Sequence, residues 1–281
     1  MLFQVLHRTV EKANVSCNNR NGGAVMKYLD KLVEMGSFSR QDIVALTGNE
    51  HAAHSLLYAY TNAGYIERIR RDLYTVISLE TKQPIANRFV IATHIAEDAC
   101  VSFHSAFEYY GYANQVFYEV YVTTESRFSG FTYDGVTYTR VSPRIHSGTI
   151  TTDTGVRITD LERTVVDSIY AFQKIGGLEE LLRCLMLVPA LQADKLLTYL
   201  NDYGQANLYQ KTGFILMQFS EQLGLPQTFF DICRSKIPKA KKYLYSERAL
   251  RSTRFVLHED WMLFAPGDLK SIVSKGVDYN S

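Results

Sequence analysis

The sequence has few of the features that mark a metal site, a disulfide-bonded protein or a membrane protein. Its four cysteines, Cys17, Cys100, Cys184 and Cys233, lie far apart and form no CxxC pair. This spacing argues against a zinc site and against a disulfide framework, and it favours buried free thiols in a reducing cytoplasm. No stretch is long and apolar enough to span a membrane, and the first residues do not resemble a signal peptide. We therefore expect a cytoplasmic protein with no membrane contact.

The common catalytic motifs are also absent. The sequence contains no GxGxxG, no GxxxxGK[ST], no HExxH and no GxSxG, which are signatures of dinucleotide, phosphate, zinc-protease and hydrolase sites. His51 and His54 have a spacing that could share a metal, but polar contacts on an exposed helix face are the better interpretation. His258-Glu259-Asp260 is predicted to be a turn. We expect no enzyme activity, no catalytic residue, no cofactor and no metal.

The net charge and the length of the chain limit the kind of basic surface and the number of domains that we expect. The net charge is only +1, so any basic surface must be local. The 281 residues make two domains the first expectation, and a 46% share of apolar residues is enough for a packed core.

The stretch from Ser37 to Val76 has the pattern of a winged helix-turn-helix. The Ser39 side chain is a good helix N-cap, and Gly48 can take the left-handed conformation of a tight turn. Apolar residues at helical spacing predict a helix on either side of that turn. The expected elements are helices 24–35, 40–46 and 50–63 and strands 65–69 and 73–77, with three arginines at or beside the last turn.

A helix that follows such a turn can lie in a DNA major groove with its N-terminal residues at base edges, and a basic wing can meet phosphates. The alternative is a plain packing or protein-interaction module. Asp72 fits DNA binding poorly, because a glycine is more usual at that turn and a carboxylate repels phosphate. The candidate DNA-binding residues here are Ser39, Arg40, Asn49, His51, His54, Ser55, Tyr58, Arg68, Arg70 and Arg71.

The rest of the chain predicts a second domain. Residues 1–23 resemble an N-terminal extension, 24–80 the winged domain, and the polar stretch 78–87 its boundary. Residues 85–275 form the second domain, with strands first and helices in its second half, so the expected fold class is α+β. The expected helices are 85–97, 102–111 (capped by Ser102), 160–172, 178–187, 190–203, 205–223 and 228–235. A short segment, 100–101, leads into the second of these helices. The expected strands are 116–123, a hairpin over 131–138, 155–159, 254–257 and 261–264.

One predicted helix carries Glu162, Arg163 and Asp167, and Arg163 faces Asp167 at the i, i+4 spacing. These residues could form an acid–base or phosphate site. The favoured alternative is a structural ion pair that holds the helix against the sheet.

A basic segment runs from Arg234 to Leu257 and contains a single acidic residue, Glu247. Two tyrosines, Tyr243 and Tyr245, are interleaved with its cations. The segment is either a solvated polar face or a second nucleic-acid surface, and the sequence favours neither. Its candidate DNA-binding residues are Lys239, Lys241, Lys242, Arg248 and Arg251.

Three segments together resemble the AbiEi-type antitoxins of bacterial type IV toxin–antitoxin systems. They are Gly64-Tyr-Ile-Glu-Arg-Ile-Arg-Arg-Asp-Leu-Tyr74, Ser102-Phe-His-Ser-Ala-Phe-Glu-Tyr-Tyr-Gly111 and Gly155-Val-Arg-Ile-Thr-Asp-Leu-Glu-Arg-Thr-Val-Val-Asp167. The resemblance implies a repressor that binds double-stranded operator DNA with inverted repeats in its own operon. It also implies that the C-terminal domain counters an AbiEii-type nucleotidyltransferase toxin without forming a stable complex. The alternatives are a ligand-sensing winged-helix regulator, and a nuclease or nucleotidyltransferase-like enzyme that uses Glu162, Arg163 and Asp167.

Overall fold

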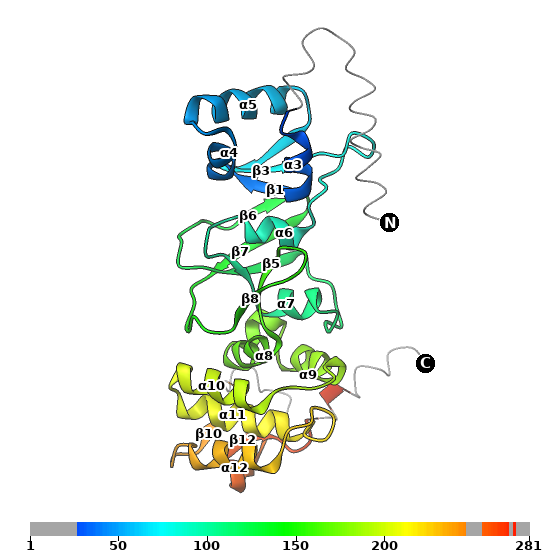
Figure 1. Ribbon diagram of the computed structural model, residues 1–281. Coiled ribbons are helices and arrows are strands. Elements are labelled where there is room, and N and C mark those ends of the chain that lie inside the picture. The colour runs from blue at the N-terminus through cyan, green and yellow to red at the C-terminus, as the bar shows by residue number, and fades with distance from the viewer. Residues whose placement is uncertain (1–26, 246–254, 270–271, 274–281) are drawn as a thin grey trace, which may run out of the picture.

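The structure, a computed structural model, describes residues 27–245, 255–269 and 272–273. Its helices and strands are mixed along the chain, so the fold class is α+β, as predicted. Figure 1 shows an elongated molecule in which three parts follow one another in chain order. A small sheet with helices comes first, a larger sheet lies in the middle, and a helical part with a second small sheet lies at the far end.

The first part contains a three-stranded antiparallel sheet with strand order β1-β3-β2. The predicted helices 40–46 and 50–63 are confirmed to within one residue, whereas strand β1 was not predicted. The element bounds are α3 Leu29–Met35, β1 Ser37–Ser39, α4 Arg40–Thr47, α5 Glu50–Asn62, β2 Ile66–Arg70 and β3 Leu73–Val76. Helix α3 begins later than the predicted residue 24, and residues 24–26 lie outside the described part of the chain.

Local signals explain where the two central helices begin and end. Ser39 and Asp42 form a capping box, in which each side chain accepts a hydrogen bond from the other residue's backbone N–H. Gly48 ends α4 with φ at 87°, a conformation that glycine adopts without a steric cost. Asn49 then caps α5 by accepting a hydrogen bond from the backbone of Ala52 at 2.8 Å. The turn between the helices is therefore fixed by residues that are adjacent in sequence.

The middle part is built on a six-stranded mixed sheet with strand order β6-β7-β5-β4-β9-β8. The predicted hairpin is confirmed, since Asp134 and Gly135 both take positive φ between paired strands. Strands β5 and β7 run parallel, so their C-terminal ends, Thr123 and Val141, lie at the same edge of the sheet. The element bounds are α6 Arg88–Thr93, β4 Cys100–Val101, α7 His104–Tyr109, β5 Glu119–Thr123, β6 Phe131–Tyr133, β7 Val136–Val141, β8 Thr149–Thr151 and β9 Arg157–Thr159.

Two predictions for this part were wrong in detail. The predicted helix 85–97 is the shorter α6, because the Asn87 side chain caps it by accepting from the N–H groups of Phe89 and Val90. Ser102 is not the cap of α7, because its hydroxyl lies 2.8 Å from the Thr123 hydroxyl on strand β5. Phe103 occupies the cap position instead, with φ at 55°.

The third part packs helices against one another and ends in a sheet of order β10-β12-β11. The predicted helix 178–187 matches α9, whereas the predicted helix 205–223 ends at Met217. The predicted strand 261–264 begins later, at Leu263, because Glu259–Trp261 forms a 3₁₀ turn. The element bounds are α8 Leu161–Tyr170, η1 Phe172–Ile175, α9 Leu178–Leu187, α10 Ala193–Tyr203, α11 Ala206–Met217, α12 Gln227–Ser235, β10 Lys242–Tyr243, β11 Phe255–His258, η3 Glu259–Trp261 and β12 Leu263–Pro266.

Buried apolar side chains form a separate cluster in each part. The first surrounds Phe38 and Ile43, the second Val122 and Ile158, and the third includes Phe229 and many leucines of the helices. The predicted second domain therefore contains two clusters. Leu73 on strand β3 belongs to the middle cluster, which means that the first part packs directly on the second.

The described cysteines agree with the expected free thiols. Cys100, Cys184 and Cys233 are unpaired and buried, while Cys17 lies outside the described residues. Within the described ranges, no helix has both the length and the apolar character that crossing a membrane demands.

Candidate nucleic-acid interface

Helix α5 presents a polar face to solvent. His51, His54, Ser55 and Tyr58 are all exposed, and Tyr58 keeps 67% of its surface accessible although it is a large aromatic residue. The opposite face of the helix is buried in the first cluster through Ala53, Leu57 and Tyr60. Since residues three, four and seven apart share one side of a helix, the four exposed side chains form one continuous strip. The structure thus brings together four of the residues that the sequence predicted for DNA contacts on this helix, whereas the predicted Asn49 is its N-cap and accepts from the Ala52 backbone.

The N-termini of α4 and α5 lie beside the turn between β2 and β3. The guanidinium of Arg40 pairs with the Glu50 carboxylate at 2.7 Å, and the backbone N–H of Arg40 donates to the Asp72 carbonyl at 3.0 Å. Arg71 contacts the carboxylate of Asp72 at 3.4 Å. Each of these two arginines therefore has a carboxylate partner, Glu50 for Arg40 and Asp72 for Arg71, and each carboxylate reduces the local positive field.

The three arginines beside that turn are placed differently. The guanidinium of Arg70 lies over the rings of Phe128 and Phe131 in the middle part, at 5.3 and 5.0 Å. This cation–π packing holds Arg70 against the protein, whereas the Arg71 side chain is 87% exposed. Arg68 is exposed and donates to the Arg70 carbonyl at 3.2 Å. Arg68 and Arg71 thus keep a surface for phosphate, and Arg70 joins the first two parts of the molecule.

Asp72 takes φ at 60°. The turn therefore has the left-handed conformation that glycine favours, although its residue is an aspartate.

The described part of the basic segment, around α12 and β10, lies at the opposite end of the molecule from α5 (Figure 1). Its residues Lys239, Lys241 and Lys242 are exposed around strand β10. Arg234 is partly engaged, because it lies over the Trp261 ring at 4.8 Å and pairs with Asp231 at 3.1 Å. The predicted DNA-binding residues Arg248 and Arg251 lie outside the described residues, so only the lysines are placed.

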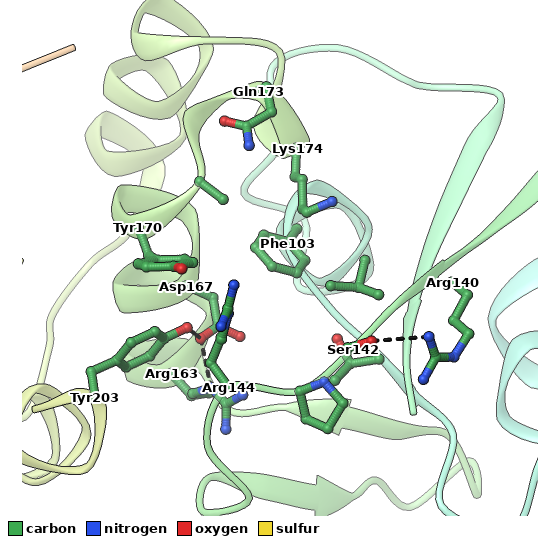
Figure 2. Close-up of a pocket in the computed structure, with 14 residues that line it drawn as sticks. Phe103, Arg140, Ser142, Arg144, Arg163, Asp167, Tyr170, Gln173, Lys174 and Tyr203 are labelled. Atoms are coloured by element: carbon green, nitrogen blue, oxygen red, sulfur yellow. Dashed lines mark hydrogen bonds and ion pairs between the residues drawn. The ribbon is translucent and has the colours of Figure 1, made fainter. Parts of the chain in front are cut away.

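Glu162, Arg163 and Asp167 do not converge on one site. Arg163 donates from Nε to the Asp167 carboxylate at 2.7 Å, with only 2% of either side chain exposed, and Figure 2 shows this pair beside Tyr203. Glu162 instead accepts from the backbone of Gln192 at 2.9 Å. The geometry fits the structural alternative that the sequence favoured.

The hydrogen bonds around this pair support the same interpretation. The Tyr203 hydroxyl donates to Asp167 at 2.5 Å, and Arg163 also donates to the Ser147 carbonyl. Burial raises the pKa of the Asp167 carboxyl in spite of the neighbouring guanidinium. These contacts tie α8 to α10 and to the loop that precedes β8.

The described part of the chain holds no cluster of three or more metal-ligating side chains. His51 and His54 are exposed on α5, and the ring of His258 lies 3.1 Å from the Pro266 carbonyl.

No family model and no curated protein matches this sequence. Among solved structures, the chain is similar to that of the Rv2827c protein from Mycobacterium tuberculosis, with a TM-score of 0.56. The two share 12% identity over 86% of this chain and 89% of that one. At this identity the likeness shows a shared α+β fold and nothing about activity.

Proposed function

We propose that this protein is a DNA-binding transcriptional repressor whose first part is a winged helix-turn-helix domain, residues 24–80. The order α3-β1-α4-α5-β2-β3, with a tight turn between α4 and α5, supports the assignment. The observation that carries it is the exposed strip of polar side chains on α5. Such a helix can enter a major groove and read base edges, while a packing module would have little use for an exposed strip with two histidines and a tyrosine.

The flanking cations fit phosphate contacts. Arg68 and Arg71 are exposed beside the wing turn, and Arg40 lies at the N-terminus of α4. Contacts to phosphate fix the position of a protein on the duplex and carry no sequence information. We therefore assign recognition to α5 and positioning to the arginines, in a protein that acts in the cytoplasm.

The lysines around β10 form a second DNA contact in this proposal. Because they lie at the opposite end of the molecule from α5 (Figure 1), a short half-site bound by α5 cannot reach them without bending. A longer duplex that runs along the molecule, or bends around it, can meet both surfaces. The distance between the surfaces thus makes the contribution of the lysines depend on DNA length.

The DNA-binding proposal is tested with two duplexes from the region upstream of the gene, about 15 and about 60 base pairs long. We expect both to bind more tightly than random duplexes of equal length, measured by fluorescence anisotropy at fixed salt. Changing Lys239, Lys241 and Lys242 together to Glu should weaken binding of the long duplex about tenfold or more, because each phosphate contact releases counterions. The short duplex should bind the variant as it binds the parent protein. Equal loss on both duplexes would contradict a separate second contact.

On the resemblance stated above, we further propose that this protein is the antitoxin of a type IV system. It would repress its own operon at inverted repeats and counter an AbiEii-type nucleotidyltransferase toxin through residues 85–275, without a stable complex. The α5 strip is separate from the two C-terminal apolar clusters. This separation supports distinct sites for DNA binding and for antitoxin activity, because the two activities then need no common residue.

Expression of the neighbouring toxin gene in a bacterial host tests the antitoxin proposal. We expect growth arrest with the toxin alone and restored growth when this protein is supplied from an unrelated promoter. A variant with His51 and Ser55 changed to Ala should still restore growth, since the changes lie on α5. Continued arrest with the parent protein, at verified expression, would refute the antitoxin role.

A ligand-sensing regulator is the second candidate, and one observation favours it. A cavity of about 450 Å³ lies between the sheet and the helices, within the size range of small-molecule sites. A gene neighbourhood of metabolic enzymes, in place of a toxin, would favour this function. The enzyme alternative has less support, because Arg163 and Asp167 already form an ion pair with each other.

A further inference from the structure

The cavity lies where the middle part meets the helical part. The C-terminal ends of the parallel strands β5 and β7 form one wall, and α8, η1 and α10 form the other. Figure 2 shows side chains from both walls arranged around this space. Ligands of α/β proteins commonly bind beyond the carboxyl ends of parallel strands. The location alone therefore makes the cavity a reasonable binding site.

The charged lining is strongly one-sided. Among the described residues, four cationic side chains, Arg140, Arg144, Arg163 and Lys174, and a single carboxylate, Asp167, line the cavity. Asp167 is already paired with Arg163. This excess of positive charge occurs in a protein whose net charge is only +1.

The other three cations have no carboxylate to neutralise them within the described residues. Arg140 donates to the carbonyls of Glu125 and Ser126 and to the Ser142 hydroxyl, which are all neutral acceptors. Within the described residues, the charged groups of Arg144 and Lys174 lie over aromatic rings and form no ion pair. Clustered cations repel one another, so an arrangement of this kind is stabilised when an anion binds. The lining thus selects for an anionic ligand.

Aromatic rings stand beside these cations. Arg144 lies over the Tyr170 ring at 5.7 Å, and Lys174 lies over the Phe103 ring at the same distance. Phe103 also has positive φ although it is not a glycine, and such backbone strain is often found at binding sites. An aromatic face next to a cation suits a ligand that joins a flat ring to an anionic group.

We propose that this cavity binds a nucleoside monophosphate. Its phosphate contacts Arg144 and Lys174, with Arg140 completing the positive field, and its base packs against the Tyr170 ring. A phosphate is favoured over a carboxylate because three unpaired cations line one cavity and a phosphate monoester brings close to two negative charges at neutral pH. The site is separate from α5 and does not depend on the proposed repressor function.

The test uses the full chain freed of nucleic acid, with AMP, GMP, CMP and UMP titrated by calorimetry at moderate salt. We expect at least one of them to bind, and the matching nucleoside without phosphate to bind at least tenfold more weakly. Changing both Arg144 and Lys174 to Gln should lower the affinity for the nucleotide by about tenfold or more. Because neither residue has a carboxylate partner in the described part of the chain, the melting temperature of the free protein should stay nearly unchanged. If the double variant melts early, each single variant should still bind several-fold more weakly than the parent.

Two further variants separate the parts of the proposal. Tyr170→Leu should weaken nucleotide binding more than it weakens binding of inorganic phosphate, because the ring contacts the base and also supports the Arg144 guanidinium. Lys241→Gln with Lys242→Gln removes two cations from the far surface and should leave binding unchanged, which excludes a net-charge effect. The proposal is overturned if none of the four nucleotides binds at about 5 mM, a concentration far above useful affinities. It is also overturned if the Arg144 and Lys174 variant binds like the parent, or if inorganic phosphate binds as tightly as the nucleotide.

Discussion

Replacing Arg163 by alanine is expected to lower the free energy of unfolding by about 3–5 kcal/mol. The guanidinium and the Asp167 carboxylate are each only 2% exposed, and they meet at 2.7 Å. Removing the cation leaves a buried carboxylate whose remaining side-chain donor, among the described residues, is the Tyr203 hydroxyl. Urea unfolding followed by circular dichroism measures the loss, and reduced solubility should accompany it.

Arg183 offers a matched control. It pairs with Glu179 at the same i, i+4 spacing and 2.9 Å, but 52% of the Glu179 side chain is exposed. Solvent screens such a pair, so Arg183→Ala should cost about 1 kcal/mol or less. If Arg163→Ala folds normally and still represses but no longer counters the toxin, the pair belongs to a functional site and the structural assignment is wrong.

Changing His51 and Ser55 to alanine together should reduce the preference for operator over random DNA by about tenfold or more. Each good base contact in a major groove contributes about 1–3 kcal/mol of discrimination. Both side chains are exposed on α5, so the melting temperature should not change. Competition binding with operator and random duplexes measures the ratio directly. An unchanged ratio would show that α5 does not recognise the operator sequence.

Arg71→Ala should affect DNA binding in a different way. The Arg71 side chain is 87% exposed beside the wing turn, so its loss should weaken binding to operator DNA and to random DNA to a similar extent. The slope of log affinity against log salt should fall by about one, as expected for one lost phosphate contact. His146→Ala is the matched histidine control, because His146 is 77% exposed in a loop far along the chain from α5. It should change neither the ratio nor the slope.

The position of Arg70 changes how wing variants should be interpreted. The sequence places it with Arg68 and Arg71 as a DNA contact, yet its guanidinium packs on Phe128 and Phe131. Arg70→Ala is therefore expected to disturb the junction between the first two parts, and its effect on DNA binding would be indirect. For the same reason a fragment that ends near residue 80 would expose Leu73, which is buried in the middle cluster, and full-length variants are the better test.

The sequence by itself determined the elements that short-range interactions specify. Ser39 with Asp42, Gly48 and Asn49 fix the turn between α4 and α5, and Asp134 with Gly135 fixes a hairpin. The Arg163–Asp167 pair was also predictable from spacing alone, because one helical turn brings i and i+4 together. In each case the interacting residues lie within a few positions of one another, so no knowledge of the tertiary fold was needed.

Only the tertiary structure decided what depends on distant contacts. Strands β1 and β8 are three residues long, too short for an alternating pattern, and they exist because partners elsewhere pair with them. The positive cavity joins Arg140, Arg144 and Lys174 from separate elements, and no motif links them in the sequence. The packing of Arg70 and the placement of Lys241 at the end opposite α5 likewise follow from how the three parts stack. Local hydrogen bonds and turn geometry are encoded by neighbouring residues, whereas cavities and surfaces arise from long-range packing of side chains that the linear sequence leaves unconnected.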